Sequence, residues 1–251
     1  MLLQPFLGAV MVYRRVAWPL LPALAAVLLV FLLREPLIVL ARQRWVWDVE
    51  RSESAPARRR LWLELPLLAL AGAALLTVWP WWILAVLGAS AAALTALAVF
   101  LHVRGCQRAT WFQALSAAGL ASSVLPACLA IGGSIPHWAW WFWALHSAHY
   151  LAAILVVHAR LDARIAARRM APFAIPRPAM VAPFVFLLAA GELALRFMPF
   201  YAAAMALSAA VHFFNLRHLS TPKSLATPLT TIGLRAMAVS IAFTLLLVAG
   251  S

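Results

Sequence analysis

Apolar residues dominate nine stretches of this chain, and short polar or basic segments separate them. Within each stretch the apolar residues run on without alternating, which favours membrane-spanning helices over the strands of a closed barrel. A helix needs ~20 such residues to cross a bilayer, so the first stretch is too short to be a full span. The pattern predicts helices over residues 1–13, 16–33, 61–78, 81–102, 111–132, 137–158, 178–195, 198–214 and 233–250.

The composition agrees with a membrane protein. Of the 251 residues, 66% are hydrophobic and 11% are charged, whereas soluble domains are about half apolar and a quarter charged. The fold predicted is therefore all-α and polytopic, with eight full spans and one partial span in a single membrane domain, 1–251. The links between stretches hold Pro80, Pro136 and Pro199, at positions where a missing N–H does little harm.

The distribution of basic residues predicts an orientation. Of the 20 Lys and Arg residues, 17 follow the even-numbered stretches and 3 follow the odd-numbered ones. Basic loops of membrane proteins stay in the cytoplasm, so we expect the N-terminus inside and the C-terminus outside. The net charge of +13 then reflects topology, and the bilayer, not a nucleic acid, is the expected partner.

A set of polar residues lies at the cytoplasmic ends of the even-numbered stretches. They are Arg34, Glu35, His102, Arg104, His158, Arg160, Asp162, His212, Asn215 and Arg217. If those four helices adjoin, these side chains line one chamber, and arginine suits phosphate or carboxylate groups. The hypothesis is a site for an anionic head group with an apolar, lipid- or isoprenoid-like tail. The alternative is that these residues only mark helix ends, where long basic side chains reach the interface.

Two further features leave other functions open. His146 and His149 lie at i, i+3 in one stretch. They are candidates for metal or haem ligands, for proton carriers, or for partners in helix–helix hydrogen bonds. Glu192 and Arg196 stand at i, i+4 and are expected to form an ion pair within the helix. The alternative is that the Glu192 carboxylate binds the coupling ion of a transporter. A small-solute or ion transporter and a haem- or metal-associated subunit therefore remain alternatives, and no sequence motif indicates a reaction.

Three segments resemble the YwiC-like family of bacterial integral membrane proteins: MLLQPFLGAV, FLLREPLIVLARQR and TTIGLRAMAVSIAFTLLLV. The resemblance implies a bacterial cytoplasmic membrane but no activity, because none is established for the family. The chain lacks the family's amino-terminal His-Gly-Ala-Trp-Ala box and has Arg235 where an acidic residue is expected. Since that box precedes a segment like MLLQPFLG, we expect the native chain to begin upstream of Met1.

The layout is also similar to that of the UbiA family of intramembrane prenyltransferases. Nine spans, an inward N-terminus and enlarged loops after spans two and six are shared features. In that family, paired aspartates in the two loops hold magnesium against a diphosphate, and hard cations need several oxygen ligands. Here the loops hold only the isolated Asp48 and Asp162, so the resemblance implies that metal-dependent chemistry is lost or different.

Overall fold

The structure is a computed structural model that describes residues 2–106, 109–219, 221 and 225–251. Throughout this described part the regular secondary structure is helical, as the apolar pattern predicted. The helices are α1 (Leu3–Tyr13), α2 (Leu20–Trp45), α3 (Ser54–Leu76), α4 (Trp81–Val103), α5 (Thr110–Ala121), α6 (Val124–Gly132), α7 (His137–Arg168), α8 (Arg177–Leu195), α9 (Pro199–Arg217) and α11 (Leu229–Ala249).

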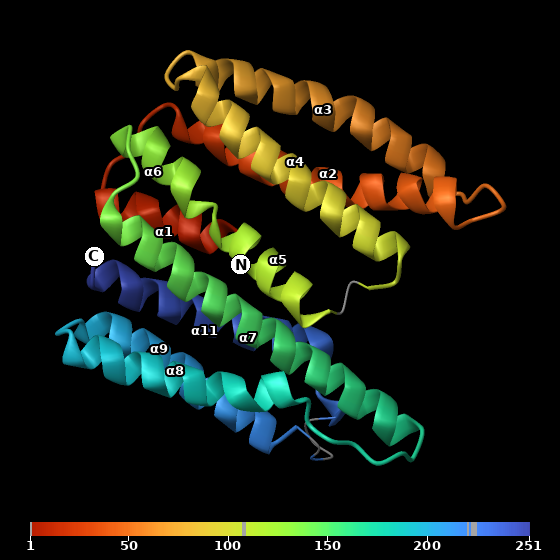
Figure 1. The fold of residues 1–251 in the computed structure, drawn as a ribbon, viewed down its shortest axis with the longest axis vertical. Helices are drawn as coiled ribbons and strands as arrows, with labels where there is room; N and C mark the ends of the chain where they lie inside the picture. The colour runs from red at the N-terminus through yellow and green to blue at the C-terminus, as the bar shows by residue number, and fades with distance from the viewer. Residues whose placement is uncertain (1, 107–108, 220, 222–224) are drawn as a thin grey trace.

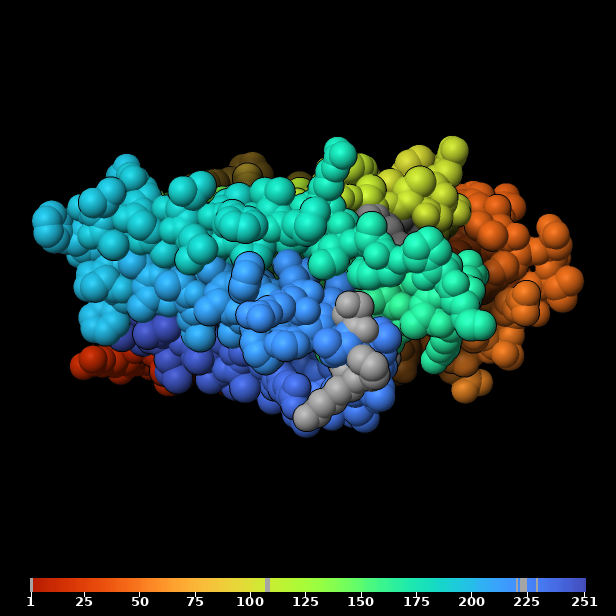
Figure 2. All heavy atoms as spheres, turned by 90° about the horizontal axis from the view of Figure 1, so that it is seen from below, coloured from red at the N-terminus to blue at the C-terminus, as the bar shows by residue number. Residues whose placement is uncertain are grey.

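The helices form two groups with a short middle layer between them. Helices α2, α3 and α4 lie on one side, α7, α8, α9 and α11 on the other, and α1, α5 and α6 between (Figure 1). Successive long helices run in opposite directions, so α2, α4, α7 and α9 all end at the same end of the molecule. We call it the basic end; in Figure 2, which shows the molecule from below, residues near the end of α7 lie toward the right and the link between α8 and α9 lies at the left.

Seven helices are long and apolar enough to cross a membrane: α2, α4, α5 with α6, α7, α8, α9 and α11. The chain is therefore a multi-pass helical membrane protein. Helix α1 is apolar but short, with 11 residues. Helix α3 is not among these seven helices, because the charged residues Arg59, Arg60 and Glu64 occupy its first half.

Helices α2 and α7 extend furthest beyond their apolar stretches, which corrects the predicted boundaries. Helix α2 continues past Leu33 to Trp45 and has 26 residues, or about 39 Å, against the ~30 Å of a hydrocarbon core. Helix α7 continues to Arg168. The two expected enlarged loops are thus mostly helix, because polar residues continue a helix readily once it has left the apolar layer.

The predicted span 111–132 is interrupted and forms α5 and α6. Pro126 lies four residues after Ser122, so it cannot donate to the Ser122 carbonyl and its ring presses against that group. The Leu125 N–H donates to the Ser122 carbonyl instead, at 2.9 Å. The Ser123 hydroxyl donates to the Leu2 carbonyl at the start of α1, at 2.7 Å, which ties the interruption to the neighbouring helix.

Small residues let the central helices approach closely, as is usual where lipid offers no hydrophobic drive for association. Ala9, Ala117, Ala121, Ala127, Ala139 and Ala204 are completely buried. At Gly8 in α1, a Cβ would lie 2.6 Å from a ring carbon of Phe142 in α7. Phe142 is itself fixed between Trp138 and His146, at ring-centroid distances of 5.6 and 5.0 Å.

We expect Gly8→Ala to destabilise the fold, because the completely buried Phe142 ring already packs against Trp138 and His146. The loss should be about 1–3 kcal/mol in the free energy of unfolding, the usual cost of overpacking. Denaturant-induced unfolding in detergent micelles measures it. Gly88→Ala in α4 is the matched control, because nothing lies within 4 Å of a Cβ there. Equal stability of the two variants would contradict the packing described.

Candidate functional site

Two of the polar residues predicted on α2 and α4, Arg34 and His102, contact each other. A guanidinium nitrogen of Arg34 lies 3.4 Å from His102 Nε2, and His102 Nδ1 lies 2.8 Å from the Ala98 carbonyl one turn earlier in α4. The Nε of Arg34 is buried and has no hydrogen-bond partner among the described residues. This pair forms the α2–α4 part of the predicted ring.

Helix α5 lies between this pair and the remaining residues. The Phe112 ring meets the edge of His102 at 6.5 Å between centroids, and Gln113 Nε2 lies 2.6 Å from His158 Nδ1 on α7. Gln113 is buried and was not predicted. The predicted residues thus lie in separate groups on α2–α4 and α7–α9, rather than around one chamber.

The second group joins α7 to α9. Arg160 is only 7% exposed and donates from Nη2 to the Asn215 side-chain oxygen at 3.2 Å. Its Nε is buried and has no partner in the described part of the chain. Asn215 donates in turn to the Val211 carbonyl at 2.9 Å. Asp162 is half-buried on the same helix, two residues after Arg160.

Three predicted residues do not join either group. Glu35, Arg104 and Arg217 are exposed, and the Arg104 guanidinium lies over the Phe100 ring at 5.1 Å from its centroid. At the opposite end of the molecule, the predicted pair of Arg196 and Glu192 is confirmed, with 2.8 Å between Nε and Oε1 in exposed side chains.

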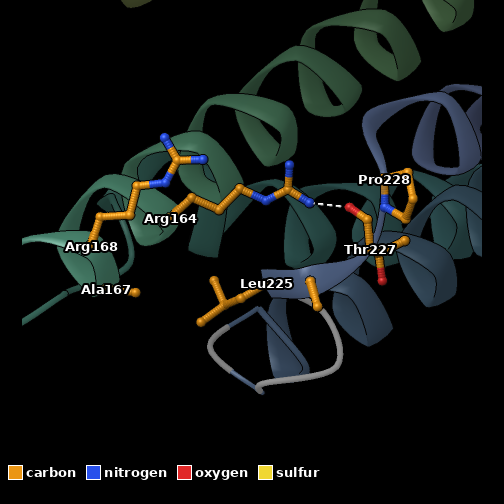
Figure 3. A pocket seen from close by; sticks show the side chains of 7 residues that line it. Arg164, Ala167, Arg168, Leu225, Thr227 and Pro228 are labelled. Atoms are coloured by element: carbon orange, nitrogen blue, oxygen red, sulfur yellow. Dashed lines mark hydrogen bonds between the residues drawn. The ribbon is translucent and has the colours of Figure 1, made fainter.

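Arg164 and Arg168, one and two turns after Arg160, line a pocket at the basic end. Its volume is about 520 Å³, and its opposite wall is the segment that leads into α11. Arg164 extends across the pocket and donates to the Thr227 carbonyl, with Pro228 beside it (Figure 3). Because α7 continues to Arg168, Arg160, Arg164 and Arg168 stand at i, i+4, i+8 and lie on one face of the helix. The pocket lining is Arg164, Ala167, Arg168, Leu225, Ala226, Thr227 and Pro228.

The remaining predicted histidine, His212 on α9, turns toward α7 and not toward the basic end. Its ring centroid lies 5.9 Å from that of His149 and 5.8 Å from that of Phe186. His212 is 4% exposed, and neither ring nitrogen has a hydrogen-bond partner among the described residues.

His149 is held between two hydroxyls from other helices. Its Nδ1 lies 2.6 Å from Ser208 Oγ on α9, and its Nε2 lies 3.0 Å from Ser240 Oγ on α11. The Phe243 ring stacks on the imidazole at 4.4 Å with an interplanar angle of 12°. The ring is 1% exposed, so both contacts are shielded from solvent and lipid.

His146, one turn before Tyr150 on α7, has partners on both ring nitrogens. Its Nδ1 lies 2.9 Å from the Phe142 carbonyl and its Nε2 lies 3.1 Å from Thr244 Oγ1 on α11. Thr244 Oγ1 also lies 2.8 Å from the Ser240 carbonyl. We call His146, His149, His212, Ser208, Ser240 and Thr244 the histidine network.

The three hydroxyl residues of the network were missed, although the sequence carries a signal for them. Ser208 and His212 stand at i, i+4 in one apolar helix, and Ser240 and Thr244 stand at i, i+4 in another. Such spacing places each pair on one helix face. What the sequence lacks is the information that these two faces meet the His146–His149 face of α7.

The network differs from a metal centre in its composition. No group of three His, Cys, Asp or Glu side chains that could hold a metal ion occurs within the described ranges. His146 and His149 are instead occupied by hydroxyl and carbonyl partners, which is the helix–helix hydrogen bonding expected of buried polar groups in a membrane.

Comparison with known proteins adds no relative from which a function could be carried over. The chain matches no protein-family model, no curated protein and no solved structure.

We expect Ser208→Ala to destabilise the helix bundle, because it leaves His149 Nδ1 buried without a partner. The loss should be about 1 kcal/mol in the free energy of unfolding, since interhelical hydrogen bonds in membranes are modest. Unfolding in micelles measures it, with Ser90→Ala on the exposed surface of α4 as the control. If both variants unfold alike, the Ser208–His149 contact contributes nothing to stability.

Proposed function

We propose that this membrane protein binds an anionic amphiphile, such as a lipid or isoprenoid-like molecule, at the basic end of α7, α9 and α11. The observation that carries the proposal is the pair of buried Nε atoms of Arg160 and Arg164, which lack hydrogen-bond partners in the described structure. A guanidinium that is taken out of water without full pairing is costly, and an anion would supply the missing acceptor.

The charges around the pocket support the same ligand class. Arg160 interacts electrostatically with Arg164 and with Arg235 on α11, so like charges lie close together. In the segment 160–177 five arginines accompany one acidic residue, Asp162. Mutual repulsion of the guanidiniums falls when an anion binds between them, and their planar donor groups match phosphate or carboxylate oxygens.

The surface next to the pocket supports an apolar tail. Helix α11 begins beside Thr227 and Pro228 and carries a row of exposed apolar side chains along its length. The row consists of Leu234, Met237, Ile241 and Leu245. A head group on Arg164 and Arg168 would leave a tail free to lie along this row, which a small soluble anion could not use.

The charge asymmetry supports an orientation with the basic end in the cytoplasm, and the resemblance to the YwiC-like family supports the cytoplasmic membrane of a bacterium as the location. We further propose membership of the YwiC-like family, on the three segments that resemble it. One of them, MLLQPFLGAV, supplies most of α1, and another, FLLREPLIVLARQR, supplies the basic half of α2.

A small-solute or ion transporter is the second candidate function. It is favoured by the histidine network, which lies in the middle of the bundle on the same helices as the Arg160–Asn215 contact. Glu192 has no part in this candidate, because it is exposed and paired with Arg196 at the opposite end.

The orientation can be tested with the chain's own cysteines, because Cys106 is exposed near the basic end and Cys128 is buried. A membrane-impermeant maleimide should label Cys106 in inside-out vesicles and not in intact spheroplasts. The matched control is Cys106→Ser combined with Ser251→Cys, which should show the opposite pattern. Labelling of Cys106 in intact spheroplasts would overturn the orientation.

Retained lipid tests the ligand. Protein in nanodiscs that contain phosphatidylglycerol and phosphatidylcholine is released into the gas phase and analysed by native mass spectrometry. The Arg164→Gln/Arg168→Gln variant loses two charge-assisted contacts. The amount of bound phosphatidylglycerol should therefore fall roughly tenfold, which corresponds to a loss of about 1.4 kcal/mol in binding free energy.

The control is Arg58→Gln/Arg59→Gln, at the exposed start of α3 on the same end of the molecule. It removes the same charge but leaves the pocket intact, so it should retain lipid as the unmodified protein does. An equal loss in both variants would indicate a general surface attraction and contradict a site at the pocket.

A further inference from the structure

The arginines of α7 form a column at the basic end that is longer than one phosphate group. Arg160, Arg164 and Arg168 stand one turn apart on one face of the helix. Their Cα atoms therefore extend over about 12 Å along the helix axis. Whether a single anion can reach all three guanidiniums depends on how freely these side chains can move.

Two of the three guanidiniums are held toward different helices. Arg160 donates to the Asn215 side chain on α9, at 3.2 Å. Arg164 crosses the pocket and donates to the Thr227 carbonyl at the entry to α11, whereas Arg168 remains on the α7 side (Figure 3). The guanidiniums cannot converge on a single phosphate unless these contacts break. The arrangement therefore favours a ligand with anionic groups at more than one place.

A fourth arginine belongs to α11. Arg235 is exposed and lies close enough to Arg160 to interact with it electrostatically, as Arg164 also does. It stands seven residues after Pro228, which lines the pocket, and so about two turns into the helix. Cations therefore face the basic end from both α7 and α11, but Arg235 does not line the pocket itself.

The charge of this cluster exceeds what a lipid with one phosphate neutralises. Arg160, Arg164, Arg168 and Arg235 are all cationic, and the acidic residue nearest to them in the sequence is Asp162. Asp162 stands two residues after Arg160, about 200° around the helix, so it lies on another side of α7. One phosphate leaves most of the positive charge unpaired where little water screens it, and a second phosphate reduces that repulsion further.

The basic end also has room for a larger head group and for its tails. The pocket has a volume of about 520 Å³, within the range of small-molecule sites. Basic pockets between transmembrane helices on the cytoplasmic side are typical sites for lipids that carry several phosphates. On α11, the exposed apolar residues Leu234 and Met237 stand on either side of Arg235 in the sequence. A head group that reaches Arg235 thus places its tails beside the same apolar row.

We propose that the ligand of the basic end is a phospholipid whose head group contains two phosphates joined by a short polyol, as in cardiolipin. This inference rests on the proposed binding of an anionic amphiphile and names the class of lipid. One phosphate lies in the pocket against Arg164 and Arg168, and the other lies outside it against Arg235. The polyol separates the two phosphates, because the arginines that they contact belong to different helices.

The preference can be tested in nanodiscs of phosphatidylcholine that contain either cardiolipin or phosphatidylglycerol, matched for total phosphate. Native mass spectrometry counts the lipid molecules that the released protein retains. The unmodified protein should retain roughly tenfold more cardiolipin, because the second phosphate adds charge-assisted contacts. Equal retention of the two anionic lipids would overturn the two-phosphate site and leave the binding of an anionic amphiphile intact. Retention of neither above phosphatidylcholine would overturn both.

Arg235→Gln distinguishes the two phosphate positions. Retention of cardiolipin should fall roughly tenfold, to the level of phosphatidylglycerol, because the second phosphate loses its cation. Retention of phosphatidylglycerol should be unchanged, because Arg235 lies outside the pocket lining. The control is Arg59→Gln, which removes one exposed arginine near the start of α3 and should affect neither lipid. An equal effect of Arg235→Gln and Arg59→Gln on cardiolipin would overturn the proposal.

Discussion

The central bundle depends on the hydrogen bonds that two buried imidazoles, His146 and His149, make to neighbouring helices. Apolar contacts alone fix helices weakly in a bilayer, because lipid tails are as apolar as leucine. His149 needs a partner on each nitrogen, and the two serines that supply them belong to different helices. One side chain of α7 therefore sets the rotation of α9 and α11, and alanines around it allow the close approach that these short hydroxyls require.

The basic pocket and the histidine network lie on the same helices. Arg160 contacts Asn215, which is less than one turn from His212 on α9. The contact between α7 and α9 therefore positions both groups of polar side chains.

Hydropathy was sufficient to place the helices, because the bilayer demands long apolar stretches with internally paired backbones. It was less informative about where helices end, as in α2 and α7, because a polar sequence can be helix or loop once it leaves the apolar layer. The interruption at Ser122 had a visible cause in Pro126. It was missed because proline inside a membrane helix need not kink it, and Pro36 and Pro183 lie inside uninterrupted helices.

The candidate site was predictable residue by residue but not as an arrangement. Sequence identified Arg160, His149 and His212 as polar groups in apolar surroundings. The periodicity of a helix does not show which other helices it contacts. The contacts of Arg160 with Asn215 and of His149 with Ser208 and Ser240 therefore could not be predicted. For the same reason, the insertion of α5 between His102 and His158 was not foreseen.

The position of α1 has a consequence for biogenesis. This helix packs against α6 and α11, which follow it in the chain by more than a hundred and more than two hundred residues. During synthesis it must therefore wait in the membrane with its glycine- and alanine-lined face uncovered while the intervening helices are inserted. Its second partner, α11, is synthesised more than two hundred residues after it, so the bundle closes around α1 only after the intervening helices have entered the membrane.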